Sequence, residues 1–214
     1  NHLRKEGIKP PEWDGAVICR QDVARITRID IAPPSDRQGK IRSLEGIEHF
    51  TSLEYLAFPS HEVIRLDVRK NPSLTYLDGS YNGLEEILLG SSAALTHLKV
   101  KGNRLTGLDT EGLVALTRLE CADNRLSGLE VGHLKGLTYL DCRKNRLTSL
   151  QVHRNAALKV LDCSENVLTE LEVRPLRNLE SLDCSHNRLP GLSVAGLSCL
   201  SMLKCKRNEL TTLE

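Results

Sequence analysis

Leucine recurs through most of this chain at a fixed interval of 21 residues. The first column of leucines begins at Leu53 and ends at Leu200, and a second leucine follows three residues after each member. Further apolar columns begin at Val63, Leu66 and Val68, and together the columns give the consensus LxxLxCxxNxLTxLxVxxxxx. Because one unit of this length cannot bury its own apolar edge, the fixed period predicts that the units stack as successive coils.

The pattern within each unit predicts one short strand, followed by an extended segment that returns to the start of the next strand. The stretch LxxLxC places three apolar residues inward from a strand and its approach. The return segments, such as EVRPLRN at 172–178, are too short for a full α-helix, so we expect extended chain or one turn of 3-10 helix there. Stacked strands then form a parallel sheet, spaced by ~4.8 Å, on the concave face of a solenoid.

Cysteine fills the sixth position of the last five units. These residues are Cys121, Cys142, Cys163, Cys184 and Cys205. A buried free cysteine behaves as a small hydrophobic residue, so we expect core packing. Stacked strands hold the thiols parallel and too far apart for a disulfide, and a straight row does not converge on a metal ion. We therefore predict a structural cysteine ladder without a metal site.

Asparagine fills the ninth position of all units after the first, where His61 takes its place. We expect its side-chain amide to bond the backbone groups of the turn that leaves the strand, which no β-ladder reaches. The structural column comprises Asn82, Asn103, Asn124, Asn145, Asn166, Asn187 and Asn208.

The consensus resembles the leucine-rich repeat family. More narrowly, it is similar to the bacterial 21-residue class with a cysteine in place of one leucine, which includes internalin J and related surface proteins of Bacteroidetes and treponemes. The resemblance covers residues 53–214 and implies a horseshoe-shaped leucine-rich repeat solenoid with little α-helix. It also implies a role in adhesion or host contact at the cell surface or in the periplasm, although this fold by itself specifies no function.

We expect a single domain in three parts. Residues 1–25 form an N-terminal cap, in which Trp13 covers the exposed end of the stack. Residues 26–52 form a divergent first repeat that is interrupted by an inserted loop, APPSDRQG. Residues 53–214 form the regular array, with seven full units and a truncated eighth unit that stops at Glu214.

One junction between units departs from the consensus. Pro59 lies inside the expected strand, where proline removes a donor from the ladder, and Gly79 removes an inward side chain from the core. We predict a weak or broken ladder at this junction and a hydrophobic notch lined by Phe58, Pro59 and Gly79. In the alternative interpretation, Phe58 packs into the gap and nothing binds there, since protein interiors rarely leave voids open.

The candidate binding residues lie on the concave face, where side chains that do not point inward must emerge. All four tyrosines fall there, and Tyr and Arg dominate binding hot spots. The alternative is that tyrosine merely favours a strand. The predicted partner-binding residues are Tyr55, Tyr76, Tyr81, His97, Arg118, Tyr139, Asp141 and Arg143.

Three aspartates follow one another in the fifth column, at Asp141, Asp162 and Asp183. Like charges directly opposed on neighbouring strands are unfavourable, so something must offset them. The sequence offers Arg143, Lys144 and Lys206 alongside, or a cationic partner. We expect a solvated acidic stripe that is available to a basic partner, because catalytic carboxylates need distinct environments and calcium needs a wrapped site.

Composition and motifs narrow the function further. The formal net charge is +1, and basic residues alternate with acidic ones, which argues against nucleic-acid binding. There is no apolar run of the ~20 residues that span a bilayer, no H-E-x-x-H motif and no phosphate-binding glycine loop. No cofactor is expected.

We therefore expect a non-enzymatic protein–protein interaction module, extracellular, at the cell surface or in the periplasm, although no signal peptide is visible in the chain. Its expected partner is a protein, such as a host cell-surface or matrix protein. One alternative is a receptor for a small hydrophobic ligand near Phe58 and Gly79. Another is the targeting domain of a larger secreted effector enzyme.

Overall fold

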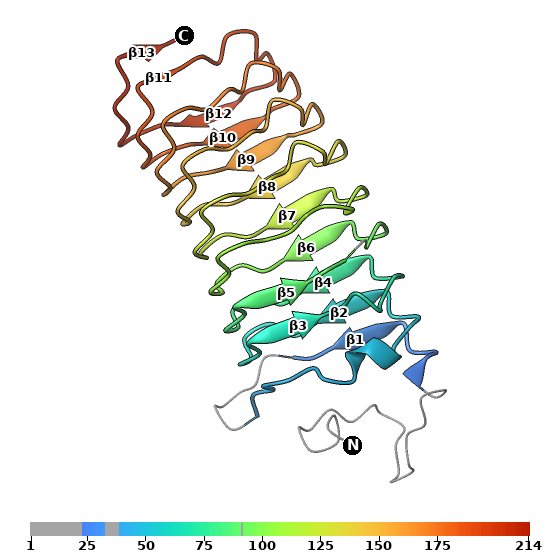
Figure 1. Cartoon of the computed structure of the whole chain (residues 1–214). Helices are drawn as coiled ribbons and strands as arrows, with labels where there is room; N and C mark the ends of the chain where they lie inside the picture. Colours follow the sequence, from blue (N-terminus) through green and yellow to red (C-terminus); the bar gives the residue numbers. More distant parts are fainter. Residues whose placement is uncertain (1–22, 33–38, 91) are drawn as a thin grey trace.

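The repeats form a solenoid of stacked coils (Figure 1). The computed structural model describes residues 23–32, 39–90 and 92–214. Nine short strands pair side by side in one parallel sheet, which confirms the predicted fold class. In sheet order they are β1 (Arg28–Asp30), β2 (Tyr55–Ala57), β4 (Tyr76–Asp78), β6 (His97–Lys99), β7 (Arg118–Glu120), β8 (Tyr139–Asp141), β9 (Val160–Asp162), β10 (Ser181–Asp183) and β12 (Met202–Lys204).

The strands pair in strict register, so each column of the sequence becomes a physical row. From β2 onward, every strand residue lies opposite the residue 21 positions further along, as Leu56 does with Leu77. The strand β1 joins the same register, with Ile29 opposite Leu56, so the divergent first repeat supplies the first coil of the sheet. A residue at a given repeat position therefore touches its equivalents in the next coils.

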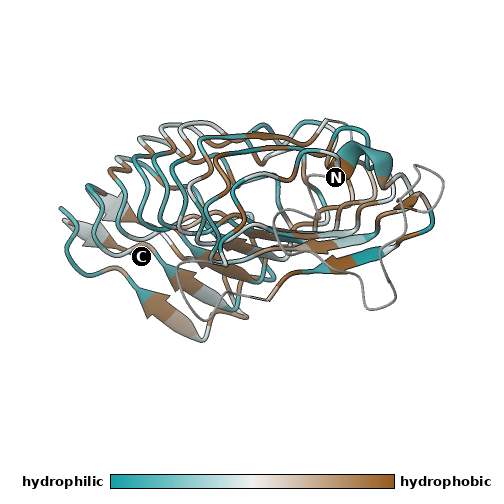
Figure 2. Ribbon diagram, turned by 90° about the horizontal axis from the view of Figure 1, so that it is seen from below, coloured by the Kyte–Doolittle hydropathy of each residue, from teal (hydrophilic) through white to brown (hydrophobic). Residues whose placement is uncertain are grey.

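The return segments lie across the coil from the sheet (Figure 2) and are mostly turns and extended chain. Among the described residues, one 3-10 helix, η1 (Ile47–His49), precedes the regular array. Two small parallel pairs also occur among the returns, β3 (Arg65–Asp67) with β5 (Glu86–Leu88) and β11 (Gly191–Leu192) with β13 (Thr212–Leu213). These pairs were not predicted from the sequence.

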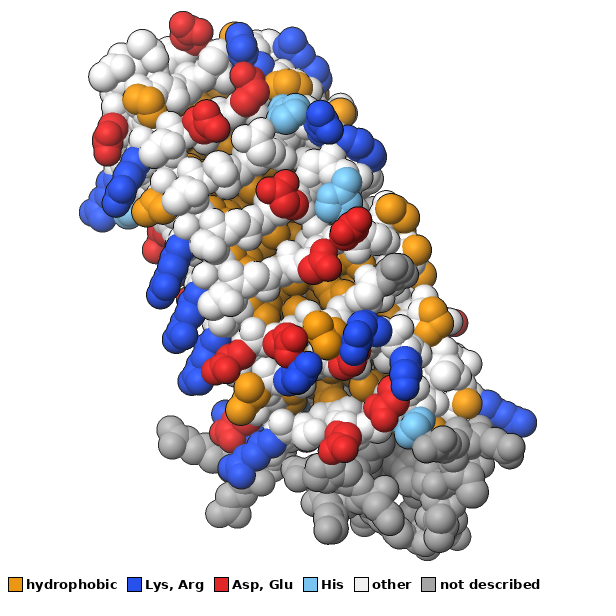
Figure 3. Space-filling model, in the orientation of Figure 1, with side chains coloured by type: hydrophobic (Ala, Val, Ile, Leu, Met, Phe, Trp, Pro, Cys, Tyr) orange, Lys and Arg blue, Asp and Glu red, His pale blue; other side chains and the backbone are white. Residues whose placement is uncertain are grey.

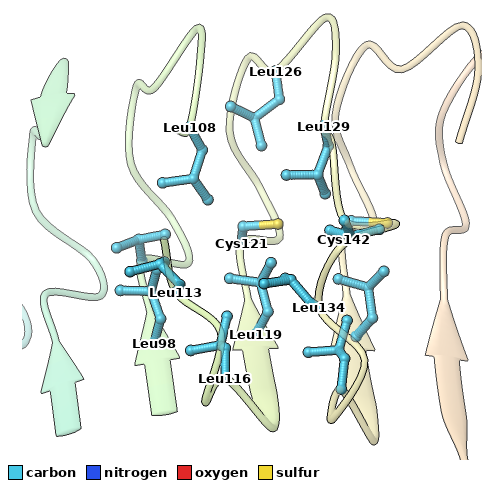
Figure 4. Packing of buried hydrophobic residues seen from close by; sticks show 14 of the residues in the cluster. Leu98, Leu108, Leu113, Leu116, Leu119, Cys121, Leu126, Leu129, Leu134 and Cys142 are labelled. Carbon is cyan, nitrogen blue, oxygen red and sulfur yellow. The ribbon is translucent and has the colours of Figure 1, made fainter. Parts of the chain in front are cut away.

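Leucine side chains from the strands and the returns fill the interior (Figure 4). Members of each leucine column, such as Leu98, Leu119 and Leu140, have no exposed surface. Burying one such side chain stabilises the fold by about 1.5–3 kcal/mol, so repetition of the unit accumulates stability coil by coil.

The cysteine ladder belongs to this core. Cys121, Cys142, Cys163 and Cys184 are fully buried free thiols, and Cys205 in the last coil is half-buried. Figure 4 shows Cys121 and Cys142 on adjacent coils, both pointing into the interior. Burial raises the pKa of the Cys184 thiol to about 12, so this thiol stays protonated at neutral pH.

The asparagine column closes the turn after each strand. Nδ2 of Asn124 donates to the carbonyl oxygens of Val100 (2.9 Å) and Cys121 (3.1 Å), and its Oδ1 accepts from the backbone N–H of Leu105 (3.0 Å). The amide thus joins its own coil to the preceding one. The same bridge recurs at Asn82, Asn103, Asn145, Asn166, Asn187 and Asn208.

The eighth position, directly before the asparagine, adopts a left-handed backbone in every unit of the array. Its φ is 55° at Tyr81, 53° at Asp123 and 57° at His186. Residues other than glycine rarely adopt this conformation, and the bonds on both sides of the turn hold it here.

The predicted weak ladder at Pro59 is wrong. The strands β2 and β4 pair over all three residues, and the ladder continues through Phe58 N–H to Asp78 O and Ser60 N–H to Ser80 O, both 2.9 Å long. The sheet therefore passes this junction without interruption.

The reason lies in the direction of the backbone N–H at the seventh position, which Pro59 occupies. In other units this N–H turns back to the carboxylate of the fifth position, as Ser80 does to Asp78 (3.0 Å) and Ser185 does to Asp183 (3.0 Å). A proline at this position removes no bond between strands, and the fifth position of its unit is Ala57, which has no carboxylate to satisfy.

No hydrophobic notch opens beside Gly79. The Phe58 side chain is fully buried, and a Cβ atom on residue 79 would lie 2.8 Å from Phe58 Cζ and 3.2 Å from Leu84 Cδ1. The phenyl ring therefore fills the space that the missing side chain leaves, as in the alternative interpretation of this junction.

The proposed cap largely falls outside the described residues, including Trp13, and so does most of the inserted loop. In the part of the chain that the structure describes, no helix has the length and apolar character needed to cross a membrane.

Candidate binding surface on the sheet

The outward side of the nine-stranded sheet, called the sheet face below, carries a continuous stack of rings. The Arg28 guanidinium lies 3.5 Å from the centroid of the Tyr55 ring. The rings of Tyr55 and Tyr76 are 4.4 Å apart and within 5° of parallel, and His97 follows at 5.9 Å from Tyr76. We call these four residues the tyrosine stack. It forms because register places the third position of each strand against the next.

The stack holds its rings in a fixed orientation at the surface. Tyr55, Tyr76 and His97 are each half-buried, since each ring covers part of its neighbour. Burial raises the pKa of the Tyr76 hydroxyl, so it remains a neutral hydrogen-bonding group at physiological pH. The Thr96 hydroxyl lies 2.9 Å from Nδ1 of His97 and fixes that ring as well. Rings with few free rotamers lose little entropy when a partner binds.

A second cation–ring pair continues the row beyond the tyrosine stack. The Arg118 guanidinium lies 3.6 Å from the centroid of Tyr139. Nε of Arg118 also donates to Glu120 Oε1 (2.7 Å), and Lys99 Nζ reaches the same carboxylate at 3.6 Å. The guanidinium is therefore held between a ring and a carboxylate, which fixes it as part of the surface.

The predicted solvated stripe of aspartates is wrong for Asp141, which is buried, whereas Asp162 and Asp183 are half-buried. Asp141 has 3% of its surface exposed, and burial raises the pKa of its carboxyl group against the opposing effect of Arg143. Arg143 lies between two aspartates, with Nε 3.5 Å from Asp141 Oδ1 and one terminal nitrogen 3.1 Å from Asp162 Oδ2. Lys204 pairs with Asp183 at 3.5 Å. The charges are thus offset inside the sheet face.

A charged groove of about 320 Å³ lies on the C-terminal half of the sheet face. It forms where short seventh-position side chains, such as Ser164 and Ser185, lie beside the long ones of Arg143 and Lys206. Sequence reasoning missed this groove, although the alternation of short and long residues in one column was the available signal. Its lining comprises Lys101, Asp123, Arg143, Lys144, Asp162, Ser164, Glu165, Asp183, Ser185, His186, Lys204 and Lys206.

The eight predicted partner-binding residues therefore divide into groups. Tyr55, Tyr76 and His97 lie together in the tyrosine stack, and Arg118 pairs with Tyr139. Asp141 and Arg143 form the ion pair described above. Tyr81 does not join the stack, because the left-handed turn after β4 carries it to an exposed site where its ring covers Gly102.

The sheet face offers groups for noncovalent contacts. It presents rings, guanidinium groups, ammonium groups and carboxylates that are already paired with one another. Among the described residues, no cluster of three or more His, Cys, Asp or Glu side chains could hold a metal ion.

Comparisons with known proteins agree with this architecture. A family model described as Leucine Rich Repeat matches residues 178–200. No curated protein matches the chain. Among solved structures, the functional domain of InlJ from Listeria monocytogenes, which includes a cysteine ladder, is 28% identical with a TM-score of 0.53, over 91% of this chain and 54% of that chain.

Two further structures are similar. The LRR protein LIC12759 from Leptospira interrogans is 28% identical with a TM-score of 0.67, over 78% of this chain and 52% of that chain. YopM from Yersinia enterocolitica is 29% identical with a TM-score of 0.66, over 77% of this chain and 35% of that chain. The chain thus spans about half or less of the length of these three proteins. It is a leucine-rich repeat solenoid that resembles bacterial proteins of this kind, including the cysteine-ladder protein InlJ.

Proposed function

We propose that this solenoid is a non-enzymatic module that binds a partner protein through its sheet face. The observation that carries the proposal is the row formed by the tyrosine stack with Arg118 and Tyr139, because Tyr and Arg account for much of the binding energy in protein interfaces. The leucine-rich repeat fold suits such a role, since solenoids present extended surfaces for binding.

The charged groove would supply specificity beside the row. Its basic and acidic side chains alternate, so a partner must match both signs in the correct order. We therefore expect the interaction to weaken as salt is added, with most of the effect on the association rate.

We further propose that the protein acts outside the cytoplasm or at the cell surface, and that it contributes to adhesion or host contact. The support for this setting is the resemblance to the cysteine-ladder domain of InlJ and to the other bacterial leucine-rich repeat proteins. Its partner would then be a host cell-surface or matrix protein. The small-ligand alternative loses its site, because Phe58 fills the space beside Gly79.

The test compares a change in the row with a matched change outside it. Purified cell-surface and matrix proteins are screened by surface plasmon resonance against the wild-type chain, the double variant Tyr55→Ala/Tyr76→Ala and the control Tyr81→Ala. A partner that binds the wild type should bind the double variant at least about 10-fold more weakly, because two hot-spot rings are lost, and the control within about 3-fold.

Circular dichroism and thermal unfolding establish that both variants remain folded. Equal binding by the folded double variant would remove the sheet face as the site. If no protein in the panel bound the wild-type chain, the adhesion proposal would fail.

A further inference from the structure

A second surface of the solenoid carries a row of arginines at the tenth repeat position, where the chain has left the sheet. We call this row the arginine edge. Figure 3 shows Lys and Arg side chains following one edge of the array. The tenth position is arginine in four of five consecutive units, with Val167 as the interruption, and all four arginines are exposed. They are Arg104, Arg125, Arg146 and Arg188.

The backbone holds these residues in line. The N–H of Arg104, Arg125 and Arg146 donates to the carbonyl oxygen of the eleventh residue in the preceding coil, each at 2.9 Å. Consecutive members therefore sit one coil apart, which is ~4.8 Å for stacked strands. Three guanidinium groups thus start from a straight line ~10 Å long.

The arginine edge differs from the sheet face in its charge balance. Arg104 reaches Glu85 at 3.8 Å, with both side chains more than half exposed. Arg125, Arg146 and Arg188 make no ion pair with any described residue. By contrast, Arg118 and Arg143 on the sheet face are both held by carboxylates.

The acidic residues nearest in sequence do not neutralise the arginine edge. Asp123 and Glu165, at the eighth position, line the charged groove on the sheet face, and Lys144 pairs with Glu165 at 3.9 Å. Because aligned like charges are unfavourable, the arginine edge gains stability from any anion that bridges its members.

A row of hydroxyl groups runs beside the arginines. The twelfth position, two residues after the tenth, supplies an exposed hydroxyl side chain in four of these five units, and Pro190 follows Arg188 in the fifth. Neither position carries an aromatic residue in these units. The hydroxyl residues are Thr106, Ser127, Thr148 and Thr169. Hydroxyl donors suit a sugar polymer, whereas single-stranded nucleic acid is held by aromatic rings on which its bases stack.

We infer that the arginine edge binds a linear sulfated polysaccharide. A sulfate offers three acceptor oxygens, so the guanidinium groups of arginines on neighbouring coils, whose backbones are ~4.8 Å apart, can share one sulfate, whereas the two oxygens of a carboxylate are taken up by a single arginine. The periodic row then matches a polymer with repeated sulfates. This inference uses a surface separate from the sheet face, so it stands or falls independently of the proposed protein partner.

The test measures binding of a heparin dodecasaccharide to the full chain by isothermal titration calorimetry at several salt concentrations. The variant Arg125→Gln/Arg146→Gln should lower the affinity at least about 10-fold and reduce the salt slope by about two, because two anion contacts are lost. The matched control is Arg65→Gln/Arg174→Gln, which removes the same charge from exposed arginines paired with Glu86 and Glu172. The control should bind within about 3-fold of the wild type.

A gain-of-function variant completes the design. Val167→Arg fills the interruption and should tighten heparin binding several-fold, an outcome that loss of folding cannot imitate. Desulfated heparin should bind far more weakly than heparin. The inference is overturned if heparin does not bind, if both double variants lose affinity equally, if desulfated heparin binds as well, or if a single-stranded DNA of equal charge binds more tightly.

Discussion

Phe58 and Gly79 compensate for each other across one junction of the core, since the phenyl ring of one coil occupies the space of the missing side chain in the next. Both residues occupy the sixth position of their units, which is cysteine in the last five units. The pair therefore replaces two medium-sized residues with one large residue and one that has no side chain, while the sheet above it remains continuous.

This relationship predicts strong coupling between the two positions. Phe58→Cys should lower the free energy of unfolding by about 3 kcal/mol, because it leaves a cavity. Gly79→Cys should lower it by about 1–3 kcal/mol, because the new side chain meets the ring. The double variant, which restores the cysteine column, should lose at least about 1 kcal/mol less than the sum of the two. Chemical denaturation measures all three, and additive losses would contradict the compensation.

The hydrogen bonds of the asparagine column predict that truncating one of these side chains to alanine lowers the stability strongly. Asn124→Ala removes the amide that joins two coils and leaves buried backbone groups without partners, so the free energy of unfolding should fall by at least about 2 kcal/mol. Asn178, which makes one exposed bond to Ala156, is the control and should cost under about 1 kcal/mol when changed to alanine. Similar losses in urea denaturation for the two variants would show that the column has no special role.

Asp141 predicts a pH dependence of stability. Burial raises the pKa of its carboxyl group in the folded state, so the folded chain holds this proton more tightly than the unfolded chain. The protonated carboxyl group therefore contributes stability below the pKa of the unfolded chain, which is about 4. This contribution is lost as the pH rises through the higher pKa of the folded chain.

Asp141→Asn, which is neutral at every pH, should therefore be more stable than the wild type at pH 7, and the difference should shrink below about pH 4. Thermal unfolding of both chains across this range measures the difference. A variant that is less stable at pH 7 would show that the pair with Arg143 outweighs the cost of burial.

The cysteine ladder predicts a sharp order of thiol reactivity. Cys199 is exposed and should react with iodoacetamide within minutes, with Cys205 slower. Cys121 and Cys142 should stay unmodified until the chain unfolds, because they are buried and burial raises their thiol pKa values. Peptide mass spectrometry after timed alkylation locates each modification. Early labelling of a ladder cysteine would contradict its place in the core.

The repeat pattern was sufficient to predict the fold because identical units meet identical neighbours. Once Leu56 lies beside Leu77, the same register extends to each following coil, and the inward place of Cys121 follows from its offset in the unit. The same logic assigned Tyr55 and Tyr76 to one surface before their stacking was known.

Features that depend on a particular residue at a particular junction were not predictable. Pro59 removes no hydrogen bond between strands, because the backbone N–H at the seventh position does not point to the next strand. The length of the repeat does not specify this direction. The burial of Asp141 depends on where the Arg143 side chain lies between two coils. The small pairs β3–β5 and β11–β13 form where two neighbouring return segments are both extended. The consensus sequence does not specify the backbone conformation of these segments.

The left-handed turn at the eighth position has a consequence for how such a surface can diversify. The backbone there repeats from coil to coil whatever the side chain, and the chain has Ser, Tyr, Gly, Asp, Lys, Glu, His and Arg at that one position. Several of these residues line the charged groove. Single substitutions at this position could therefore change the binding surface while the fold beneath it stays the same.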